Sequence, residues 1–303
     1  MGTFSTDVLQ EALRDSDDNG LLSYTCDNCH LSLFSKEKVD TCIFCGHALN
    51  VSDEKIDTNG YSYFLPFNVE KEKAIKAYKR KVLFNPIIPL VFKNRKVVNN
   101  ITAVYIPACL VDINVNGDVI FIAGDKINTL KDGKNVEEIK KYNVKNYNNF
   151  DYRNVFICLW SKINDFIFQK VFTYDYSNLQ KVDLNRFEDI IINSDLDQKE
   201  ELLQINTKIV NKSLSVIRTS VSHELKKVSE NGLQTNLNDY KKVFVPVYYL
   251  NVNNKGKDYQ FLMNGQNEIN RFKLTFGIPE LIVSSLVIFL IIFGISFLLA
   301  SLL

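Results

Sequence analysis

The sequence has 303 residues, of which 46% are hydrophobic and 23% charged, so the chain is long enough to bury one large core or two smaller ones. Its formal net charge is only +1, from 36 basic and 35 acidic side chains, which argues against a nucleic-acid binder that is basic over its whole surface. Any electrostatic contact with a partner must therefore be local.

The N-terminal segment 1–20 combines a short helical pattern, TDVLQEALRD, with the acidic turn DSDDNG, and we expect a flexible arm. It has no cationic stretch followed by an apolar run, so we do not expect a secretory signal peptide. The bulk of the chain is therefore predicted to stay in the cytoplasm, where thiols remain reduced.

A zinc ribbon is predicted over residues 21–50, which contain four of the six cysteines in the order CxxC, twelve residues, CxxC. The four are Cys26, Cys29, Cys42 and Cys45. Each CxxC directs two thiolates at one centre, and the residues between the pairs suffice for a short β-hairpin. Four sulfur ligands leave no coordination position for water, so we predict a structural Zn²⁺ and no catalytic metal. Disulfides do not suit a reducing compartment, and a redox CxxC needs only one pair.

Two histidines adjoin the cysteine pairs, and two further cysteines lie elsewhere. His30 and His47 have a ligand chemistry that suits zinc, but with four cysteines present we expect them at the surface beside the metal. Cys109 and Cys158 lie in the apolar runs IPACLV and FICLW, which is typical of buried core thiols.

A polar linker is expected over residues 51–60, followed by an α+β domain over 61–275. The stretch YSYFLPFNV predicts a strand, and residues 69–84 have apolar positions at helical spacing with lysines on the rest of the surface. Residues 70–96 contain nine basic residues and only two acidic ones. A solvated amphipathic helix explains this pattern. The functional alternatives are contacts to phosphates of nucleic acid or to anionic lipid headgroups, through Lys76, Lys79, Arg80 and Lys81.

The middle of the chain predicts strands and one long helix. Asn116-Gly117, between alternating apolar runs, predicts a hairpin turn, and the lysine- and asparagine-rich residues 125–150 predict an exposed loop. Strands are expected in NVFICLWSK and DFIFQKVFTYDY, and a short helix in LNRFEDIII. An apolar stripe predicts a helix from Gln198 to about Glu230, capped by Asp195 or Asp197.

The segments 104–117 and 243–256 match each other at an offset of 139 residues, including Pro107 with Pro246 and Gly117 with Gly256. The match arises either by chance or from two related halves, each of which contributes a hairpin. The fold class that we expect is α+β, with an N-terminal zinc ribbon, a mainly antiparallel sheet covered by the basic helix and the long one, and one C-terminal transmembrane helix.

The C-terminal stretch 278–303 predicts that transmembrane helix. From Leu281 to Leu303 there are 23 residues without a charge, which as a helix would span about 34 Å, against roughly 30 Å for the core of a bilayer. Arg271 and Lys273 before it agree with a cytoplasmic flank. The expected localisation is a single-pass, tail-anchored membrane protein with its N-terminal bulk in the cytoplasm.

The order of several short motifs resembles a family of bacterial proteins that carry a transcription-factor-IIB-type zinc ribbon. After the CxxC pairs come Leu65-Pro66-Phe67, a lysine-rich helix with alanines, Tyr105-Ile106-Pro107, Pro246-Val247 and Asn264-Gly265-Gln266. The family usually continues the last motif with Thr-Gly, which Asn267-Glu268 replaces here. The resemblance implies an architecture but no biochemical role, because the family is of uncharacterised function.

These features predict a non-enzymatic adaptor or scaffold that docks a protein partner at the membrane. The alternative is nucleic-acid binding through the ribbon and residues 70–96. We do not expect an enzyme, because the sequence has no HExxH, GxSxG or glycine-rich phosphate loop and its three histidines are scattered.

Overall fold

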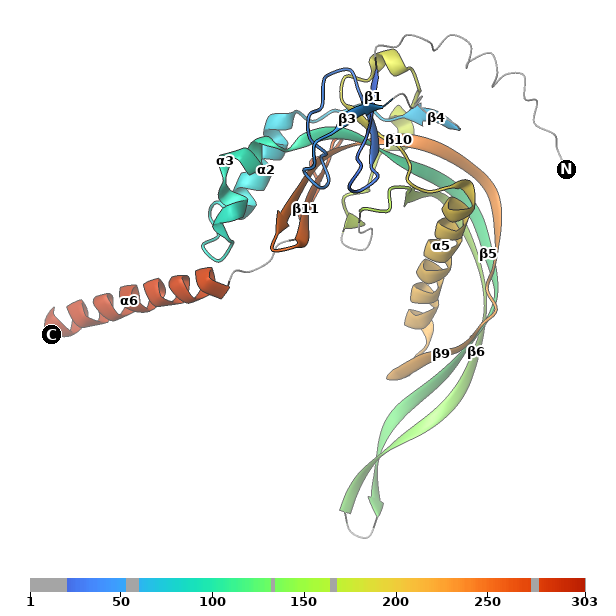
Figure 1. Cartoon of the computed structure of the whole chain (residues 1–303). Helices are drawn as coiled ribbons and strands as arrows, with labels where there is room; N and C mark the ends of the chain where they lie inside the picture. The colour runs from blue at the N-terminus through green and yellow to red at the C-terminus, as the bar shows by residue number, and fades with distance from the viewer. Residues whose placement is uncertain (1–20, 53–59, 132–133, 164–167, 274–277, 303) are drawn as a thin grey trace, which may run out of the picture. The chain divides into compact units, whose positions relative to one another are not determined.

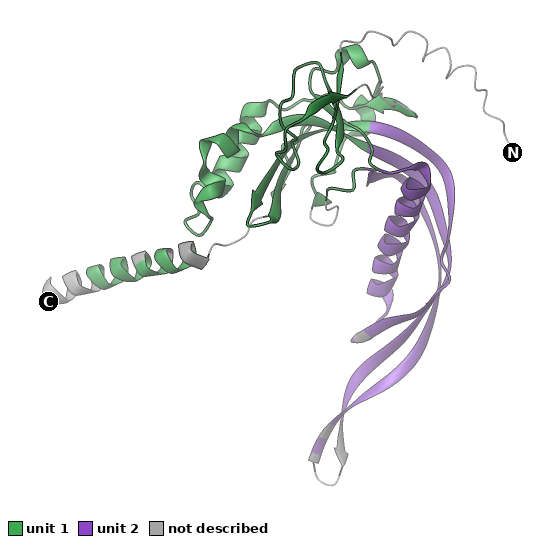
Figure 2. Cartoon of the chain, viewed as in Figure 1, with its two compact units in different colours: residues 1–107, 160–195, 244–303 green, residues 108–159, 196–243 purple. Residues whose placement is uncertain are grey.

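The computed structural model describes residues 21–52, 60–131, 134–163, 168–273 and 278–302, which include twelve strands but few helices (Figure 1). The chain divides into two compact units (Figure 2). Unit 1 comprises residues 1–107, 160–195 and 244–303, and unit 2 comprises residues 108–159 and 196–243. The arm expected over 1–20 and most of the linker expected over 51–60 lie outside the described residues.

The twelve strands form one mixed sheet. Its main path runs β12-β11-β10-β5-β8-β2-β1-β3, and β4, β6, β7 and β9 pair beside this path. The strands are β1 (Leu22–Thr25), β2 (Ser32–Ser35), β3 (Asn50–Ser52), β4 (Tyr61–Phe64), β5 (Thr102–Lys131), β6 (Lys134–Cys158), β7 (Gln180–Lys181), β8 (Ile190–Ile192), β9 (Leu225–Asn231), β10 (Gln234–Asn254), β11 (Lys257–Asn264) and β12 (Asn270–Phe272).

The short strands of the cysteine-rich segment are part of this sheet and not of a separate ribbon. β2 pairs with β8 through Leu33 and Ile192 and through Phe34 and Ile191, and β8 runs parallel to β5. Among β1, β2 and β3, β2 is an edge strand with unpaired backbone groups, and β8 satisfies these groups. The expected fold class is therefore wrong: the structure is a large mixed sheet of twelve strands with few helices.

The turn expected at Asn116-Gly117 and the loop expected over 125–150 are also wrong. β5 continues through the first and on to Lys131, and β6, which pairs with it, begins at Lys134 and contains the rest of the second. Gly117 has a φ of 137°, and a Cβ atom there would lie 2.2 Å from the carbonyl oxygen of Gly232. The glycine thus serves a close approach of two backbones rather than a hairpin turn. The second expected hairpin is confirmed: β10 and β11 pair, and Lys255 and Gly256 between them have φ values of 53° and 74°.

The long helix is confirmed at its start and wrong at its end. α5 (Gln198–Ser220) begins with a capping box, in which the Asp197 side chain accepts from the Glu200 N–H and the Glu200 side chain accepts from the Asp197 N–H. The apolar stripe continues to Val228, but residues 225–231 form β9, which pairs with β5. Pairing in the sheet therefore outweighs the local helical pattern.

The basic helix is present as α2 (Lys71–Val82), and a 3₁₀ turn, η1 (Leu90–Lys93), and α3 (Arg95–Asn99) follow it. The strand expected in DFIFQKVFTYDY is absent from its described part, residues 168–176, in which residues 169–172 form turns. The helix expected in LNRFEDIII is replaced by η3 (Leu184–Arg186) and β8, and η2 (Tyr176–Asn178) precedes them.

Separate apolar clusters stabilise the two units. In unit 1, buried side chains of α2 and η1, such as Tyr78 and Phe92, pack against β10 and β11, and the Tyr78 hydroxyl donates to the Phe92 carbonyl at 3.0 Å. In unit 2, Ile205 and Ile209 of α5 pack against residues of β5 and β6. Each helix therefore covers the strands of its own unit.

Several sequence motifs meet in unit 1. The Gly265 N–H donates to the Pro246 carbonyl at 2.9 Å, and its own carbonyl accepts from Asn68 and Val69. A Cβ on Gly265 would lie 2.5 Å from the Phe67 ring, so only glycine fits without displacement. The fully buried Asn264 donates to the carbonyls of residues 171 and 173. These bonds fix the chain around Phe67.

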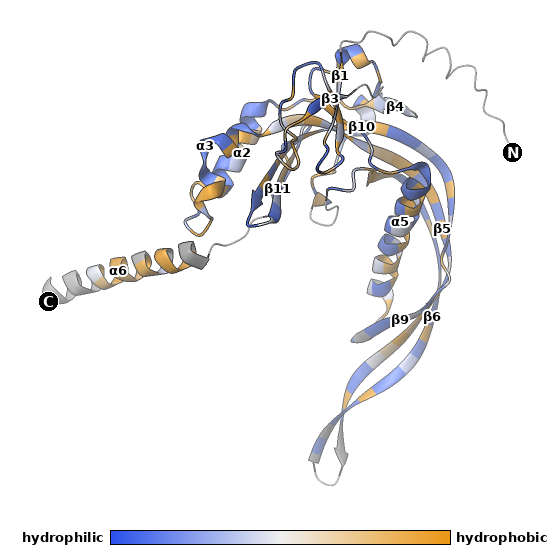
Figure 3. Ribbon diagram, viewed as in Figure 1, coloured by the Kyte–Doolittle hydropathy of each residue, from blue (hydrophilic) through white to orange (hydrophobic). Residues whose placement is uncertain are grey.

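The structure contradicts the prediction that the C-terminal helix spans a membrane. α6 runs from Ile278 to Leu302, and Figure 3 shows many apolar residues along it. A crossing needs about 20 consecutive apolar helical residues. The part of α6 with described side chains extends over 281–295, without 284 and 287, and no helix of the described residues is long and apolar enough to cross a membrane. The predictions of a transmembrane helix over 278–303 and of a single-pass membrane localisation are therefore wrong.

The close approach at Gly117 leads to a prediction for stability. Gly117→Ala should lower the free energy of unfolding of unit 2 by about 3 kcal/mol, because the new methyl group meets a backbone oxygen and the φ is strained. Gly232→Ala, in the same unit, should cost about 1 kcal/mol, because Gly232 has no positive φ and its Cβ would lie 3.0 Å from the Asp118 oxygen. Urea denaturation followed by circular dichroism measures both variants. Equal losses would contradict this account of Gly117.

Candidate metal centre

Two tight turns of the same design hold the four cysteines. In the first, the His30 N–H donates to the Cys26 carbonyl at 2.8 Å, and the Cys26 N–H donates to the carbonyl of residue 31 at 2.9 Å. In the second, the Gly46 N–H donates to the Cys42 carbonyl at 2.9 Å, and the Cys42 N–H donates to the carbonyl of residue 47 at 2.7 Å. His30 and Gly46 occupy equivalent positions with φ values of 56° and 73°. Each turn therefore directs its two thiols to the same side.

The four sulfur atoms lie together. The Sγ atoms of Cys26 and Cys45 are 3.5 Å apart, those of Cys29 and Cys42 are 3.6 Å apart, and all four lie within 4.8 Å of one another. These separations are much longer than the roughly 2 Å of a disulfide bond. Cys26 and Cys42 are buried, and Cys29 and Cys45 are half-buried. The cluster can hold a metal ion.

Backbone and side-chain donors surround the sulfur atoms. Burial raises the pKa of the Cys42 thiol to about 11, although the N–H groups of Cys45 and Phe44 donate to it and oppose the rise. Burial also acts to raise the pKa of Cys45, but hydrogen bonds from Asn28 and the His47 backbone outweigh it and hold that pKa at about 6. N–H groups directed at sulfur stabilise thiolates, which are the form that binds a metal.

The second turn is anchored to the rest of unit 1 through Phe44, which lies between its two cysteines. Its carbonyl accepts a hydrogen bond from the Asn251 side chain on β10 at 2.6 Å. Its ring lies edge-on to Trp160 with centroids 6.5 Å apart, and the Lys162 ammonium group lies 5.4 Å from its centre. The position of the cysteines is therefore tied to β10.

The other cysteines and the histidines lie as the sequence predicts. His30 and His47 are exposed and do not belong to the cluster, whereas Cys109 and Cys158 are buried in unit 2. Burial raises the pKa of Cys109 to about 12, with a further contribution from Glu201. Cys109 is therefore a protonated core thiol at neutral pH.

The basic residues singled out in the sequence lie on α2. Lys76, Lys79 and Arg80 are exposed, and Lys81 is half-buried. Burial lowers the pKa of Lys81, and the charges of Arg271 and Arg80 lower it further. The structure thus places Arg271 of β12 near enough to the basic helix for its charge to act on Lys81, which sequence spacing does not indicate.

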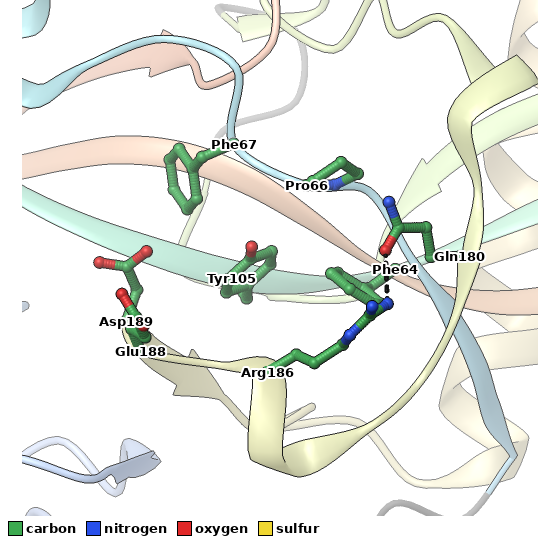
Figure 4. A pocket seen from close by; sticks show the side chains of 8 residues that line it. All are labelled: Phe64, Pro66, Phe67, Tyr105, Gln180, Arg186, Glu188 and Asp189. Atoms are coloured by element: carbon green, nitrogen blue, oxygen red, sulfur yellow. Dashed lines mark hydrogen bonds between the residues drawn. The ribbon is translucent and has the colours of Figure 1, made fainter.

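Sequence reasoning missed a pocket in unit 1. It has a volume of about 300 Å³ and is lined by aromatic, acidic and other polar side chains (Figure 4). The lining residues are Phe64, Pro66, Phe67, Tyr105, Gln180, Arg186, Glu188 and Asp189. The motifs Leu65-Pro66-Phe67 and Tyr105-Ile106-Pro107 contribute three of these residues but did not indicate a pocket, and no spacing rule joins them to residues 180–189.

Comparison of the chain with protein-family models, with curated protein sequences and with solved structures gives no match. The resemblance to the bacterial zinc-ribbon family therefore stays a prediction.

The cluster leads to a prediction for metal content. The full-length protein should purify with about one metal ion per chain, and Cys42→Ser should lose most of it because one of four ligands is removed. Elemental analysis of the purified proteins measures the ratio. The matched control is Cys158→Ala, which removes a buried cysteine outside the cluster and should keep the metal. Unchanged metal content in Cys42→Ser would contradict the assignment.

Proposed function

We propose that the chain is a non-enzymatic adaptor, stabilised by a structural Zn²⁺, that docks an acidic and partly apolar segment of a protein partner. The docking site that we propose is the α2–η1 surface, defined as the exposed basic residues Lys76, Lys79 and Arg80 together with the half-buried Lys81 and the exposed apolar residues Leu83, Phe84, Leu90 and Val91. The exposure of Phe84 and Leu90 beside these cations is the observation that carries the proposal.

The geometry of the cluster supports zinc as the metal. Four sulfur atoms placed about 2.3 Å from a central Zn²⁺ form a tetrahedron with edges of about 3.8 Å. The two shortest separations in the cluster, 3.5 and 3.6 Å, are close to this edge length. Four thiolates would fill the coordination sphere and leave no open position, so the ion would act on folding rather than on a substrate.

The apolar part of the α2–η1 surface supports a protein partner. Phe84 is 85% exposed and Leu90 is 73% exposed, and the hydrogen bond from Tyr78 to Phe92 ties η1 to α2. Four large apolar side chains within residues 83–91 are exposed to water, which is typical of a surface that another protein covers. Contacts to the phosphate groups of nucleic acid rely on charge and gain nothing from exposed apolar side chains. The apolar residues therefore favour a protein partner over the nucleic-acid alternative.

The basic part of the surface supports an acidic partner. Lys79, Arg80 and Lys81 follow one another in the last turn of α2, and Arg271 contributes a further positive charge at Lys81. Like charges brought together repel one another, and a carboxylate placed among them relieves the repulsion. Lys73, near the start of the helix, is already paired with Glu268, so the uncompensated charge lies toward the helix end.

Site-specific crosslinking tests the docking site. A photo-crosslinking amino acid at Phe84, in full-length protein expressed in its own cells, should capture a defined protein through a peptide that contains acidic and apolar residues. The double variant Lys79→Glu and Arg80→Glu should reduce this product about tenfold, because two attractive contacts become repulsive. The matched control places the same crosslinker at Tyr147, which is 71% exposed on β6, and should not capture that protein.

Three outcomes would contradict the proposal: a product that survives the charge reversal, a nuclease-sensitive product, or crosslinks to lipid alone. A nuclease-sensitive product would favour the nucleic-acid alternative.

The identity of the metal is tested separately. Elemental analysis should find zinc, and the protein should be colourless, because Zn²⁺ has no d–d transitions. Iron in the same ratio, with the visible absorption of an iron–thiolate centre, would contradict a zinc site.

A further inference from the structure

The pocket in unit 1 is built at the junction of three parts of the chain. Pro66 and Phe67 follow β4, Tyr105 lies on β5, and Arg186, Glu188 and Asp189 come from the segment between η3 and β8. Parallel pairing of β5 with β8, through Tyr105 and Ile191, fixes the acidic residues beside the tyrosine. Figure 4 shows the two carboxylates at one end of the pocket and the Arg186 guanidinium group at the other, beside Gln180.

Aromatic rings that hold one another in place form one wall. The Tyr105 ring lies edge-on to Phe67 with centroids 5.2 Å apart, and edge-on to Phe187 at 4.6 Å. Phe64 contacts both Tyr105 and Phe187. The Phe67 N–H donates to the Tyr105 hydroxyl, and the absence of a side chain at Gly265 leaves room for the Phe67 ring, which lies 2.5 Å from where a Cβ atom would be. The wall is therefore preformed and needs no rearrangement to accept a ligand.

The acidic end has negative charge that the protein compensates only in part. Among the residues that the structure describes, neither Glu188 nor Asp189 accepts a hydrogen bond or has a cation within ion-pair distance. Burial raises the pKa of Asp189, the charge of Glu188 raises it further, and Lys71 offsets only part of this effect. A positive charge placed between the two carboxylates would remove the imbalance.

At the opposite end of the pocket, Arg186 already has polar partners within the protein. The Arg186 guanidinium group donates to the Gln180 side-chain oxygen at 3.0 Å and lies 4.0 Å from Asp183. Its charge therefore does not neutralise the acidic end. The pocket is therefore polar at both ends and aromatic along one wall, so a ligand with one charged end would bind in one orientation.

We propose that this pocket binds an organic cation, in which a primary ammonium or guanidinium group pairs with Glu188 and Asp189 while the attached carbon chain lies against Phe67 and Tyr105. Carboxylates and aromatic rings both attract such a cation. Mg²⁺ or Ca²⁺ fits poorly, because each needs about six oxygen ligands and two neighbouring carboxylates beside aromatic rings supply too few. The cation belongs either to a free amine or to a lysine or arginine side chain of another protein.

Isothermal titration calorimetry on the full-length protein tests this proposal. The probes are agmatine, a free cation without a carboxylate, and Nα-acetyl-lysine-N-methylamide, which mimics a lysine side chain in a protein. The neutral control is Nα-acetyl-norleucine-N-methylamide, which has a similar carbon chain but no charge. We expect at least one cationic probe to bind, and no binding of the neutral control. Preference for agmatine indicates a free amine, and preference for the capped lysine indicates a protein side chain.

Two isosteric variants connect binding to the carboxylates. Asp189→Asn and Glu188→Gln should each weaken binding of the cationic probe by about tenfold, because a charge-assisted hydrogen bond is lost. Glu188 is exposed, so its variant keeps the test valid if Asp189→Asn does not fold. The matched control is Glu230→Gln, an exposed carboxylate in unit 2 that does not line the pocket.

Absence of heat with both cations, equal binding of the neutral control, or unchanged affinity in both pocket variants would overturn the proposal. The α2–η1 surface is tested by different residues, so failure of the cation site does not imply failure of the docking site.

Discussion

The cysteine-rich part of unit 1 is built around the convergence of four thiols. The cysteine-rich segment has only a few buried apolar side chains, such as Tyr24, Leu31 and Phe34, which is too little to fold so small a module alone. Two turns with matching hydrogen bonds bring the sulfur atoms within 4.8 Å of one another. An ion held there would therefore supply much of the energy that keeps β1, β2 and β3 in place.

The cysteine cluster affects more of unit 1 than the cysteine-rich segment, because β2 of that segment pairs with β8. Phe34 of β2 pairs with Ile191 of β8 and belongs to an apolar cluster with Phe64, Tyr105 and Phe187. The same cluster forms the aromatic wall of the pocket. The cysteine cluster, the edge of the sheet and the cation site that we propose are thus linked through shared side chains.

Sequence reasoning found the features that local chemistry determines. CxxC spacing identified the four cysteines that the structure brings together, one of the two aspartates named as caps of the long helix, Asp197, is its cap, and the hairpin between β10 and β11 was expected. It failed where distant pairing decides the conformation. Gly117 looked like a turn residue because its partner, Gly232, lies more than a hundred residues away in the chain.

The pocket was missed for the same reason, since the parallel pairing of β5 with β8 that brings Asp189 to Tyr105 leaves no local pattern. The transmembrane prediction rested on the length of an uncharged run, and no helix of the described residues meets the requirement in the structure. The loop predicted over 125–150 was wrong, because residues 134–149 of β6 pair with β5 along their length although few of them are apolar.

We infer that the cysteine-rich segment, with a metal bound, supports the sheet of unit 1 and not only itself. Hydrogen–deuterium exchange of the full-length protein, before and after removal of the metal by a chelator, tests it most directly. After removal of the metal we expect faster exchange in β1 and β2, in β8 and in the part of β5 that pairs with β8, whereas exchange in β6 and β9 of unit 2 should stay unchanged. Faster exchange confined to residues 26–45, or equal loss of protection in both units, would contradict it.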